Sequence, residues 1–240
     1  FAFGPKTPIN VPITGQRSFA CTSLPLAQIK QIGARHGAKL NDVVLAICSG
    51  ALRSYLQHKH KLPRKSLIAT VPVWLREPGN TATTAQATLT LVSLASHISD
   101  PQKRLHAICK AAGAAKSLTQ NAKTVIPTDF PSLGVPWLLG GLASLYGYSK
   151  LASVMPPIAN VAISNVPGPQ QPLYVAGAKI SGYWPLSIVE HGLGLNITLV
   201  SYCDSLDFGL TAASNALPDV YLLAQMLNQS YEELLQLPTE

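Results

Sequence analysis

The chain has 240 residues and a mass of 25.5 kDa, which is enough for one sizeable hydrophobic core or two small ones. Charged residues make up only 12% of it, against ~25% in a typical soluble domain, and 47% are hydrophobic, so we expect another polypeptide or lipid to cover part of its surface. The formal charge of +7 suits anionic lipid or a phosphate-bearing substrate, and because no nucleic-acid motif accompanies it we predict no nucleic-acid partner.

The cysteines indicate reduced thiols in a cytosolic compartment, because they are widely spaced and form no Cys-x-x-Cys pair. No metal site is predicted from them. They are Cys21, Cys48, Cys109 and Cys203. The chain begins Phe-Ala-Phe-Gly-Pro, with neither an initiator Met nor a signal-peptide pattern, and we interpret it as a fragment or a processed chain.

Residues 1–16 are rich in Pro, Gly and polar residues, and they are predicted to form an extended arm before a domain that covers residues 17–240. A strand is expected near residues 16–22. Ser23 is the expected N-cap of the following helix, and Gly37 lies just past its end. The buried face of this helix would consist of Leu26, Ile29 and Ile32.

A second helix is expected to start with Asn41 as its N-cap. Its core-facing stripe would consist of Val44, Ile47, Ala51 and Tyr55. Two strands are expected near residues 67–74 and 87–94, joined by a turn at residues 77–80. The next helix would run from residue 100 to about residue 118.

The densest basic stretch, residues 58–65, follows the second helix. It reads His-Lys-His-Lys-Leu-Pro-Arg-Lys and contains no aromatic residue. We interpret it as a solvated loop, with a contact to a coenzyme A phosphate or to a membrane as the alternatives.

Residues 130–149 carry no charge, and this length would permit a membrane span. Several Pro and Gly residues interrupt the segment, which argues against a span. Two interpretations stay open: a helix that lines a lipid tunnel or lies in a membrane surface, and an ordinary buried helix. In the first, the acyl tunnel residues would be Trp137, Leu138 and Leu142.

A strand pattern at residues 161–164 stops before Pro167-Gly168-Pro169, which forbids further ladder pairing. Ser164 and Asn165 therefore lie near the end of a strand. A hydroxyl or an amide held there can donate a hydrogen bond to charge that develops on a substrate oxygen. The alternative is that both side chains only close the turn.

The remaining chain shows strand patterns near residues 173–175, 178–186, 194–202 and 206–212, and a last helix opened by Pro218-Asp219. Helices mixed with adjacent strands predict an α/β fold: a two-layer sandwich in which helices cover one face of a mixed β-sheet.

Several of these segments match a known family in its order. They are Thr7-Pro8-Ile9-Asn10, Asn41-Asp42-Val43-Val44, Val71-Pro72-Val73, Asn160 to Pro169, Leu195-Asn196-Ile197-Thr198 and Phe208-Gly209-Leu210. Over roughly residues 5–236 the chain resembles the C-terminal half of the bacterial wax ester synthase/diacylglycerol acyltransferase (WS/DGAT) family. The catalytic signature of that family, His-His-x-x-x-Asp-Gly, lies in its N-terminal half and has no match here.

The resemblance implies a chloramphenicol acetyltransferase-like half of a pseudo-dimer, with the catalytic histidine at the junction of two similar halves, as in condensation domains. It implies an acyl-CoA:alcohol O-acyltransferase that makes wax esters or triacylglycerol, inactive as this chain alone. Ser164 would be placed like the hydroxyl that binds the oxyanion, with Asn165 as a substitute donor. Asn41-Asp42 looks like the Asn-Asp motif of the family, although helix capping explains both residues without a substrate.

The same resemblance implies the partners. They would be the histidine-bearing N-terminal half, acyl-CoA, and a long-chain alcohol or diacylglycerol, with coenzyme A entering as a substrate thioester and no cofactor. The enzyme would be cytoplasmic and peripheral at the inner membrane or a lipid-droplet surface.

Acyl transfer also needs a base. His191 is the one histidine in a plausible site neighbourhood and is the candidate base. The sequence contains no Gly-x-Ser-x-Gly elbow, which argues against Ser/His/Asp hydrolysis, and no phosphate-binding loop. Two other functions stay open: a non-catalytic lipid-surface or interaction module, and a condensation-type enzyme that uses carrier-protein thioesters.

Overall fold

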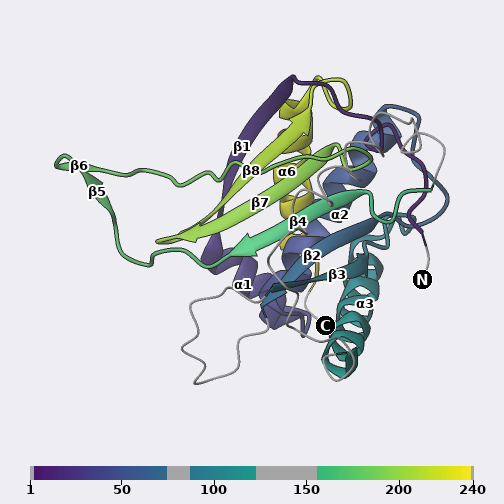
Figure 1. The fold of residues 1–240 in the computed structure, drawn as a ribbon. Coiled ribbons are helices and arrows are strands. Elements are labelled where there is room, and N and C mark those ends of the chain that lie inside the picture. Colours follow the sequence, from purple (N-terminus) through teal and green to yellow (C-terminus); the bar gives the residue numbers. More distant parts are fainter. Residues whose placement is uncertain (1–2, 75–86, 123–155, 239–240) are drawn as a thin grey trace.

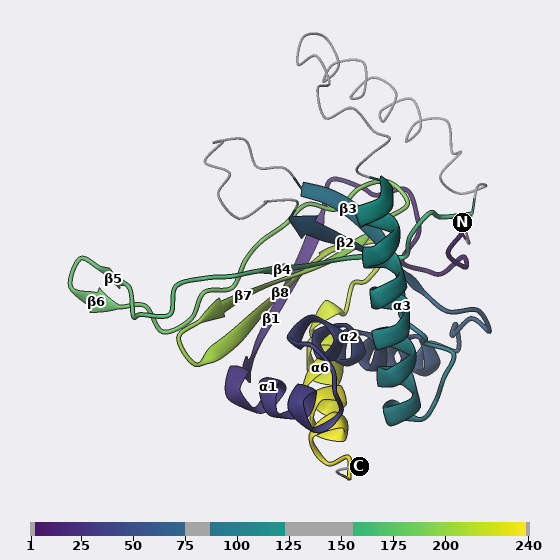
Figure 2. The same ribbon diagram turned by 90° about the horizontal axis from the view of Figure 1, so that it is seen from below.

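The structure is a computed structural model that describes residues 3–74, 87–122 and 156–238. In these residues a six-stranded mixed sheet carries four helices on one face (Figures 1 and 2). This confirms the predicted α/β sandwich. The elements are β1 (Arg17–Pro25), α1 (Leu26–Arg35), α2 (Leu40–His58), β2 (Ile68–Trp74), β3 (Ala87–Ser93), α3 (Pro101–Ala122), β4 (Val161–Val166), β5 (Tyr174–Val175), β6 (Ala178–Lys179), β7 (Leu195–Tyr202), β8 (Ser205–Ala213) and α6 (Val220–Leu235).

The strand order is β1-β8-β7-β4-β2-β3. Strand β4 is parallel to both of its neighbours, β7 and β2, whereas all other pairs in this sheet are antiparallel. The strand that carries Ser164 therefore lies inside the sheet, with both edges paired. Strands β5 and β6 form a separate hairpin that projects from the body (Figure 1).

Three local expectations are wrong, and in the first and the third of them tertiary contacts decide the backbone. Ser23 pairs with Asp207 in the β1–β8 ladder, so it is a strand residue and α1 starts after Pro25. Helix α2 starts at Leu40 with Lys39 as its N-cap, so Asn41 is not the cap. The strand expected at residues 178–186 ends at Lys179, because the chain beyond it runs over the sheet instead of pairing with an edge.

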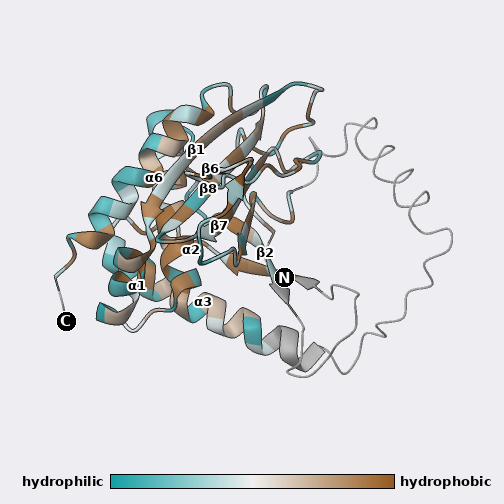
Figure 3. Cartoon of the chain, turned by 90° about the vertical axis from the view of Figure 1, so that its left-hand side faces the viewer, coloured by the Kyte–Doolittle hydropathy of each residue, from teal (hydrophilic) through white to brown (hydrophobic). Residues whose placement is uncertain are grey.

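The core lies between the sheet and the helices, and α2 is at its centre. The predicted stripe of α2 is buried, but so is every residue from 42 to 52. Helix α2 contacts α1, α3 and α6, and these helices cover the residues of α2 that lie outside the predicted stripe. The other helices keep hydrophilic residues on the side turned away from the core (Figure 3).

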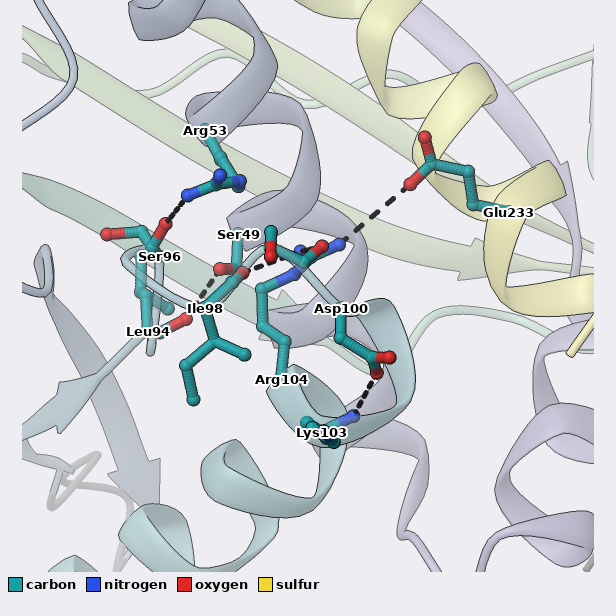
Figure 4. A network of polar contacts seen from close by, with 10 residues as sticks. Ser49, Arg53, Leu94, Ser96, Ile98, Asp100, Lys103, Arg104 and Glu233 are labelled. Atoms are coloured by element: carbon teal, nitrogen blue, oxygen red, sulfur yellow. Dashed lines mark hydrogen bonds and ion pairs between the residues drawn. The ribbon is translucent and has the colours of Figure 1, made fainter.

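A buried arginine joins α3 to α6 and to the β3–α3 connection (Figure 4). Arg104 of α3 is 2% exposed, and its Nη1 donates to the carbonyl oxygens of Ile98 and Ser99, both at 3.0 Å. Its Nη2 lies 3.9 Å from Glu233 Oε2 of α6. Burial lowers the pKa of Arg104, and the nearby Glu233 carboxylate opposes that shift. The contacts tie the β3–α3 connection to the helix layer.

The described part of the arm, residues 3–16, forms neither helix nor strand, yet it packs into the body. Ile9 is fully buried in the same core as the helices. The Asn10 side-chain amide donates to the carbonyl oxygens of Ala159 and Gly192, at 3.1 and 2.8 Å. These contacts fasten the arm to the start of β4 and to the loop before β7.

Candidate functional site

Ser164 lies on the face of the sheet opposite the helices, which we call the outer face. Val161 and Ile163 of β4 point into the core, so the alternation of the strand turns Ser164 outward. Its side chain is half-buried, and no described residue forms a hydrogen bond with its hydroxyl. The ladder register places Ser164 beside Thr198, with Gly209 and Cys21 next in the same row. Small side chains therefore flank the half-buried Ser164 hydroxyl on the outer face.

Asn165 points to the opposite face from Ser164. It pairs with Leu199, a core residue of β7, and its Nδ2 donates to Asn41 Oδ1 of α2 at 2.7 Å. The two predicted donors therefore do not converge, and the Asn165 amide is held by α2 rather than aimed where the Ser164 hydroxyl points. The sequence placed both residues at one strand end. Because successive side chains of a strand point to opposite faces of the sheet, the two side chains point in opposite directions.

Asn41 and Asp42 have different partners at the start of α2. Asn41 holds Asn165, whereas Asp42 Oδ2 accepts a hydrogen bond from the backbone N–H of Lys39 at 3.0 Å. Burial raises the pKa of the Cys109 thiol of α3, and the neighbouring Asp42 carboxylate, which the thiol hydrogen-bonds, raises it further. Asp42 thus satisfies a free helix N–H and joins α2 to α3.

A strap crosses the outer face of β8. This strap, residues 183–188, has no strand partners, and its backbone is held by side chains of the sheet. The N–H of Tyr183 donates to Asp207 Oδ2 at 2.6 Å, and the N–H of Ser187 donates to Thr211 Oγ1 at 3.2 Å. Asp207 and Thr211 are buried beneath it. Polar side chains at alternate positions of β8 therefore bind the strap by its main chain.

Gly209 is what lets the strap lie so close. Its position is between Asp207 and Thr211 on the outer face, and a Cβ there would lie 1.8 Å from the carbonyl oxygen of Pro185. The strap turns Leu186 and Ile188 to solvent, where they are 72% and 73% exposed. The strap therefore presents an apolar strip one strand beyond Thr198.

His191 makes a contact that argues against its role as a base. Its Nδ1 accepts a hydrogen bond from the backbone N–H of Ile13 at 3.2 Å. A neutral imidazole that accepts at Nδ1 carries its proton at Nε2, so no free lone pair remains to take a proton from a substrate. His191 is a fastening point for the arm in this arrangement.

The polar core that sequence reasoning missed lies at the start of β4. Asn160 is fully buried; its Oδ1 accepts from the N–H of Ile68 at 2.9 Å, and its Nδ2 donates to Asn10 Oδ1 and to the carbonyl oxygen of Pro5, both at 2.7 Å. Asn10 and Asn160 each stand in a motif noted in the sequence. Their pairing across 150 positions had no local signal.

Other candidate features lie elsewhere. A cavity of about 600 Å³ borders Lys179, Tyr202 and Asp204 at the β7–β8 turn, and Ser164 is not part of its lining. Trp137, Leu138 and Leu142 fall outside the described residues. Within the described ranges, no cluster of His, Cys, Asp and Glu is suited to a metal ion, and no helix has the length and apolar character needed to cross a bilayer.

Comparisons with known proteins agree with this architecture. The profile of the WS/DGAT C-terminal domain matches residues 84–235, and that of the wax ester synthase/diacylglycerol acyltransferase catalytic domain matches residues 2–44. A putative diacylglycerol O-acyltransferase of Mycobacterium tuberculosis (strain CDC 1551 / Oshkosh) is 41% identical over 96% of this chain and 50% of its own length. The O-acyltransferase WSD of Acinetobacter baylyi is 39% identical over 95% and 48%.

Solved structures extend the comparison. The wax ester synthase/diacylglycerol acyltransferase from Marinobacter aquaeolei VT8 superimposes with a TM-score of 0.74 and 34% identity, over 96% of this chain and 51% of that one. A condensation domain of the enacyloxin polyketide synthase gives 0.56 with 14% identity, which shows a shared fold alone. The chain spans about half the length of the curated relatives it matches. It belongs to the wax ester synthase/diacylglycerol acyltransferase family, of which it carries the C-terminal domain.

Proposed function

We propose that this chain is the C-terminal half of an acyl-CoA:alcohol O-acyltransferase that transfers a fatty acyl group from acyl-CoA to a long-chain alcohol or diacylglycerol. The observation that carries the proposal is the match of residues 84–235 to the WS/DGAT C-terminal domain. Identities of 41% and 39% to relatives named as O-acyltransferases support it. Coenzyme A is then the leaving group of a substrate.

The proposed partner is an N-terminal half of the same protein, which supplies the paired-histidine motif that this sequence lacks. The distribution of exposed apolar side chains supports a partner. Of the twelve large hydrophobic side chains exposed in the described residues, seven lie between residues 173 and 188, in the β5–β6 hairpin and the strap. Apolar surface concentrated in this way is typical of a surface that another polypeptide covers.

In the proposed reaction, a histidine of the N-terminal half removes the proton of the alcohol, whose oxygen attacks the thioester carbonyl carbon. The carbonyl oxygen becomes the oxyanion of a tetrahedral intermediate, and the Ser164 hydroxyl donates a hydrogen bond to it. The C–S bond then breaks, and coenzyme A leaves as the thiol after it takes up the proton. Ser164 suits this role because its hydroxyl faces the outer side and has no hydrogen-bond partner among the described residues.

Asn165 has a positioning role in this proposal. Its hydrogen bond to Asn41 fastens the end of β4 to the start of α2, and the backbone of Ser164 is thereby held at a defined height on the sheet. The apolar residues Trp137, Leu138 and Leu142 are proposed to line the acyl tunnel. Because the proposed substrates are lipids, we place the enzyme at the inner membrane or at a lipid-droplet surface, on the cytoplasmic side.

The test is Ser164→Ala in the full-length protein that contains this chain. Loss of a donor that is used mainly in the transition state lowers kcat and kcat/KM together, by about 10²-fold, while KM changes little. Asn165→Ala is the control on the opposite face, and we expect it to lower the melting temperature more than Ser164→Ala does. If Ser164→Ala keeps more than half of kcat, the oxyanion role is wrong.

A further inference from the structure

The loop that joins α2 to β2 carries positive charge that no described acidic group neutralises. Lys59, at its start, is paired, because its Nζ lies 2.6 Å from Asp219 Oδ2. Lys61, Arg64 and Lys65 are exposed, and none of them forms an ion pair with an acidic side chain in the described ranges. Three cations on one short loop attract a negatively charged surface.

Two large apolar side chains are exposed next to this loop. Phe3 is 56% exposed and Ile158 is 64% exposed. They are neighbours in space, because the N–H of Gly4 donates to the carbonyl oxygen of Pro157 at 2.8 Å, which fixes the chain beside each of them. This pair is separate from the apolar surface of the hairpin and strap.

Hydrogen bonds fix the chain beside Ile158 at the start of β2, where the loop ends. Asn160, two residues after Ile158, donates its N–H to the carbonyl oxygen of Ile68 at 2.7 Å, and its Oδ1 accepts from the N–H of Ile68 at 2.9 Å. Arg64 lies four residues before Ile68, so their Cα atoms are at most ~14 Å apart. Figures 1 and 2 both show the N-terminal arm beside this loop.

Exposed apolar side chains beside unpaired basic ones are the features of proteins that lie on anionic bilayers. We propose that Lys61, Arg64, Lys65, Phe3 and Ile158, the docking corner, bind the surface of an anionic phospholipid membrane. The cations face the headgroups, and the two apolar side chains enter the interface. The inference rests on the proposed function, because a lipid acyltransferase has to reach substrates that reside in or on a lipid phase.

The docking corner is at one end of β4 and leaves the candidate site accessible. Ile158 precedes β4, whereas Asn165, near its other end, contacts the start of α2. Because the basic loop follows the end of α2, docking occurs at the end of the sheet away from the Asn41–Asn165 contact. Ser164 is one residue from that contact and remains free for the other half of the enzyme.

The experiment measures sedimentation of the full-length protein with vesicles of phosphatidylcholine, with and without phosphatidylglycerol, in the absence of acyl-CoA. The loop variant is Lys61→Gln/Arg64→Gln/Lys65→Gln. Its partition onto phosphatidylglycerol vesicles is expected to fall by about 100-fold, and wild-type binding should weaken as salt is added. Phe3→Ser/Ile158→Ser should weaken binding to both kinds of vesicle.

The matched control is Lys30→Gln/Lys110→Gln/Lys116→Gln, which removes the same charge from exposed positions on α1 and α3. The proposal is overturned if the loop variant binds vesicles as the control does. It is also overturned if the loop variant raises KM for acyl-CoA while vesicle binding is unchanged, since the loop would then hold the phosphates of coenzyme A. Loop-dependent binding by a protein with no acyltransferase activity would support the docking corner and refute only the proposed function.

Discussion

Replacing Gly209 by alanine is expected to lift the strap from the outer face of the sheet. The new Cβ would lie 1.8 Å from the carbonyl oxygen of Pro185 and 2.9 Å from its carbonyl carbon, well inside van der Waals contact. Both are backbone atoms, which no rotamer change moves away. Because Gly209 is in a strand paired on both sides, the strap is the part that yields.

The magnitude follows from the hydrogen bonds that the strap would lose. One joins the N–H of Tyr183 to the buried Asp207 carboxylate, and another joins the N–H of Ser187 to the Thr211 hydroxyl. A bond to a charged group and a neutral bond contribute together roughly 2–4 kcal/mol to the free energy of unfolding. For a domain of this size that corresponds to a fall in melting temperature of about 5–15 °C.

Thermal denaturation followed by circular dichroism measures the effect, and limited proteolysis tests whether cleavage appears within residues 183–188. Gly113→Ala is the matched control, because nothing lies within 4 Å of its added Cβ. In a helix interior this exchange should raise stability by roughly 0.5–1 kcal/mol. A Gly209→Ala protein that melts within about 1 °C of wild type, with the strap still protected, would refute the close approach on which the reasoning depends.

Two further substitutions test the helix layer. Arg104→Met leaves the carbonyl oxygens of Ile98 and Ser99 without their donor, and we expect it to lower the free energy of unfolding by roughly 2–4 kcal/mol in urea denaturation. Glu233→Gln removes an ion pair of 3.9 Å whose carboxylate is 55% exposed, and we expect it to lower the same free energy by less than about 0.5 kcal/mol. Equal losses of stability in the two variants would contradict the conclusion that Arg104 acts mainly through its hydrogen bonds to the two carbonyl oxygens. Burial raises the pKa of Cys48 from 9.0 to about 12, so the folded state keeps this proton when the unfolded chain has lost it. The contribution of the protonated thiol to stability is complete below pH 9 and falls by about 1.4 kcal/mol per pH unit above it, until pH 12. Cys48→Ala should flatten this alkaline decline, and an unchanged slope in the variant would show that other groups cause it.

Much of the fold could be predicted because the periodicity of the sequence is local. The strand expected near residues 194–202 is β7, in which Leu195, Ile197 and Leu199 occupy alternate positions and all point into the core. Val220 and Leu223 are spaced at a helical interval, and both lie on the buried face of α6. Period two and period 3.6 are properties of a single element, so each is visible before the chain folds.

The candidate site could be predicted only in part. The Pro-Gly-Pro stop located Ser164 and Asn165 near a strand end, but their opposite directions depend on which residues of β4 face the helices. The partner of Asn165 is Asn41, 124 positions away, and no local pattern links the two.

By itself the sequence therefore determined most of the elements, the core-facing residues of β7 and α6, and the family. The tertiary structure decided which side chains meet. It assigned Ser23 to a ladder instead of a cap and buried residues 42–52 of α2 on every side. It also laid residues 183–188 over Gly209, although a strand was expected as far as residue 186. The physical reason is that pairing and packing join residues distant in sequence, and their free energy exceeds the fractions of a kcal/mol by which local propensities differ.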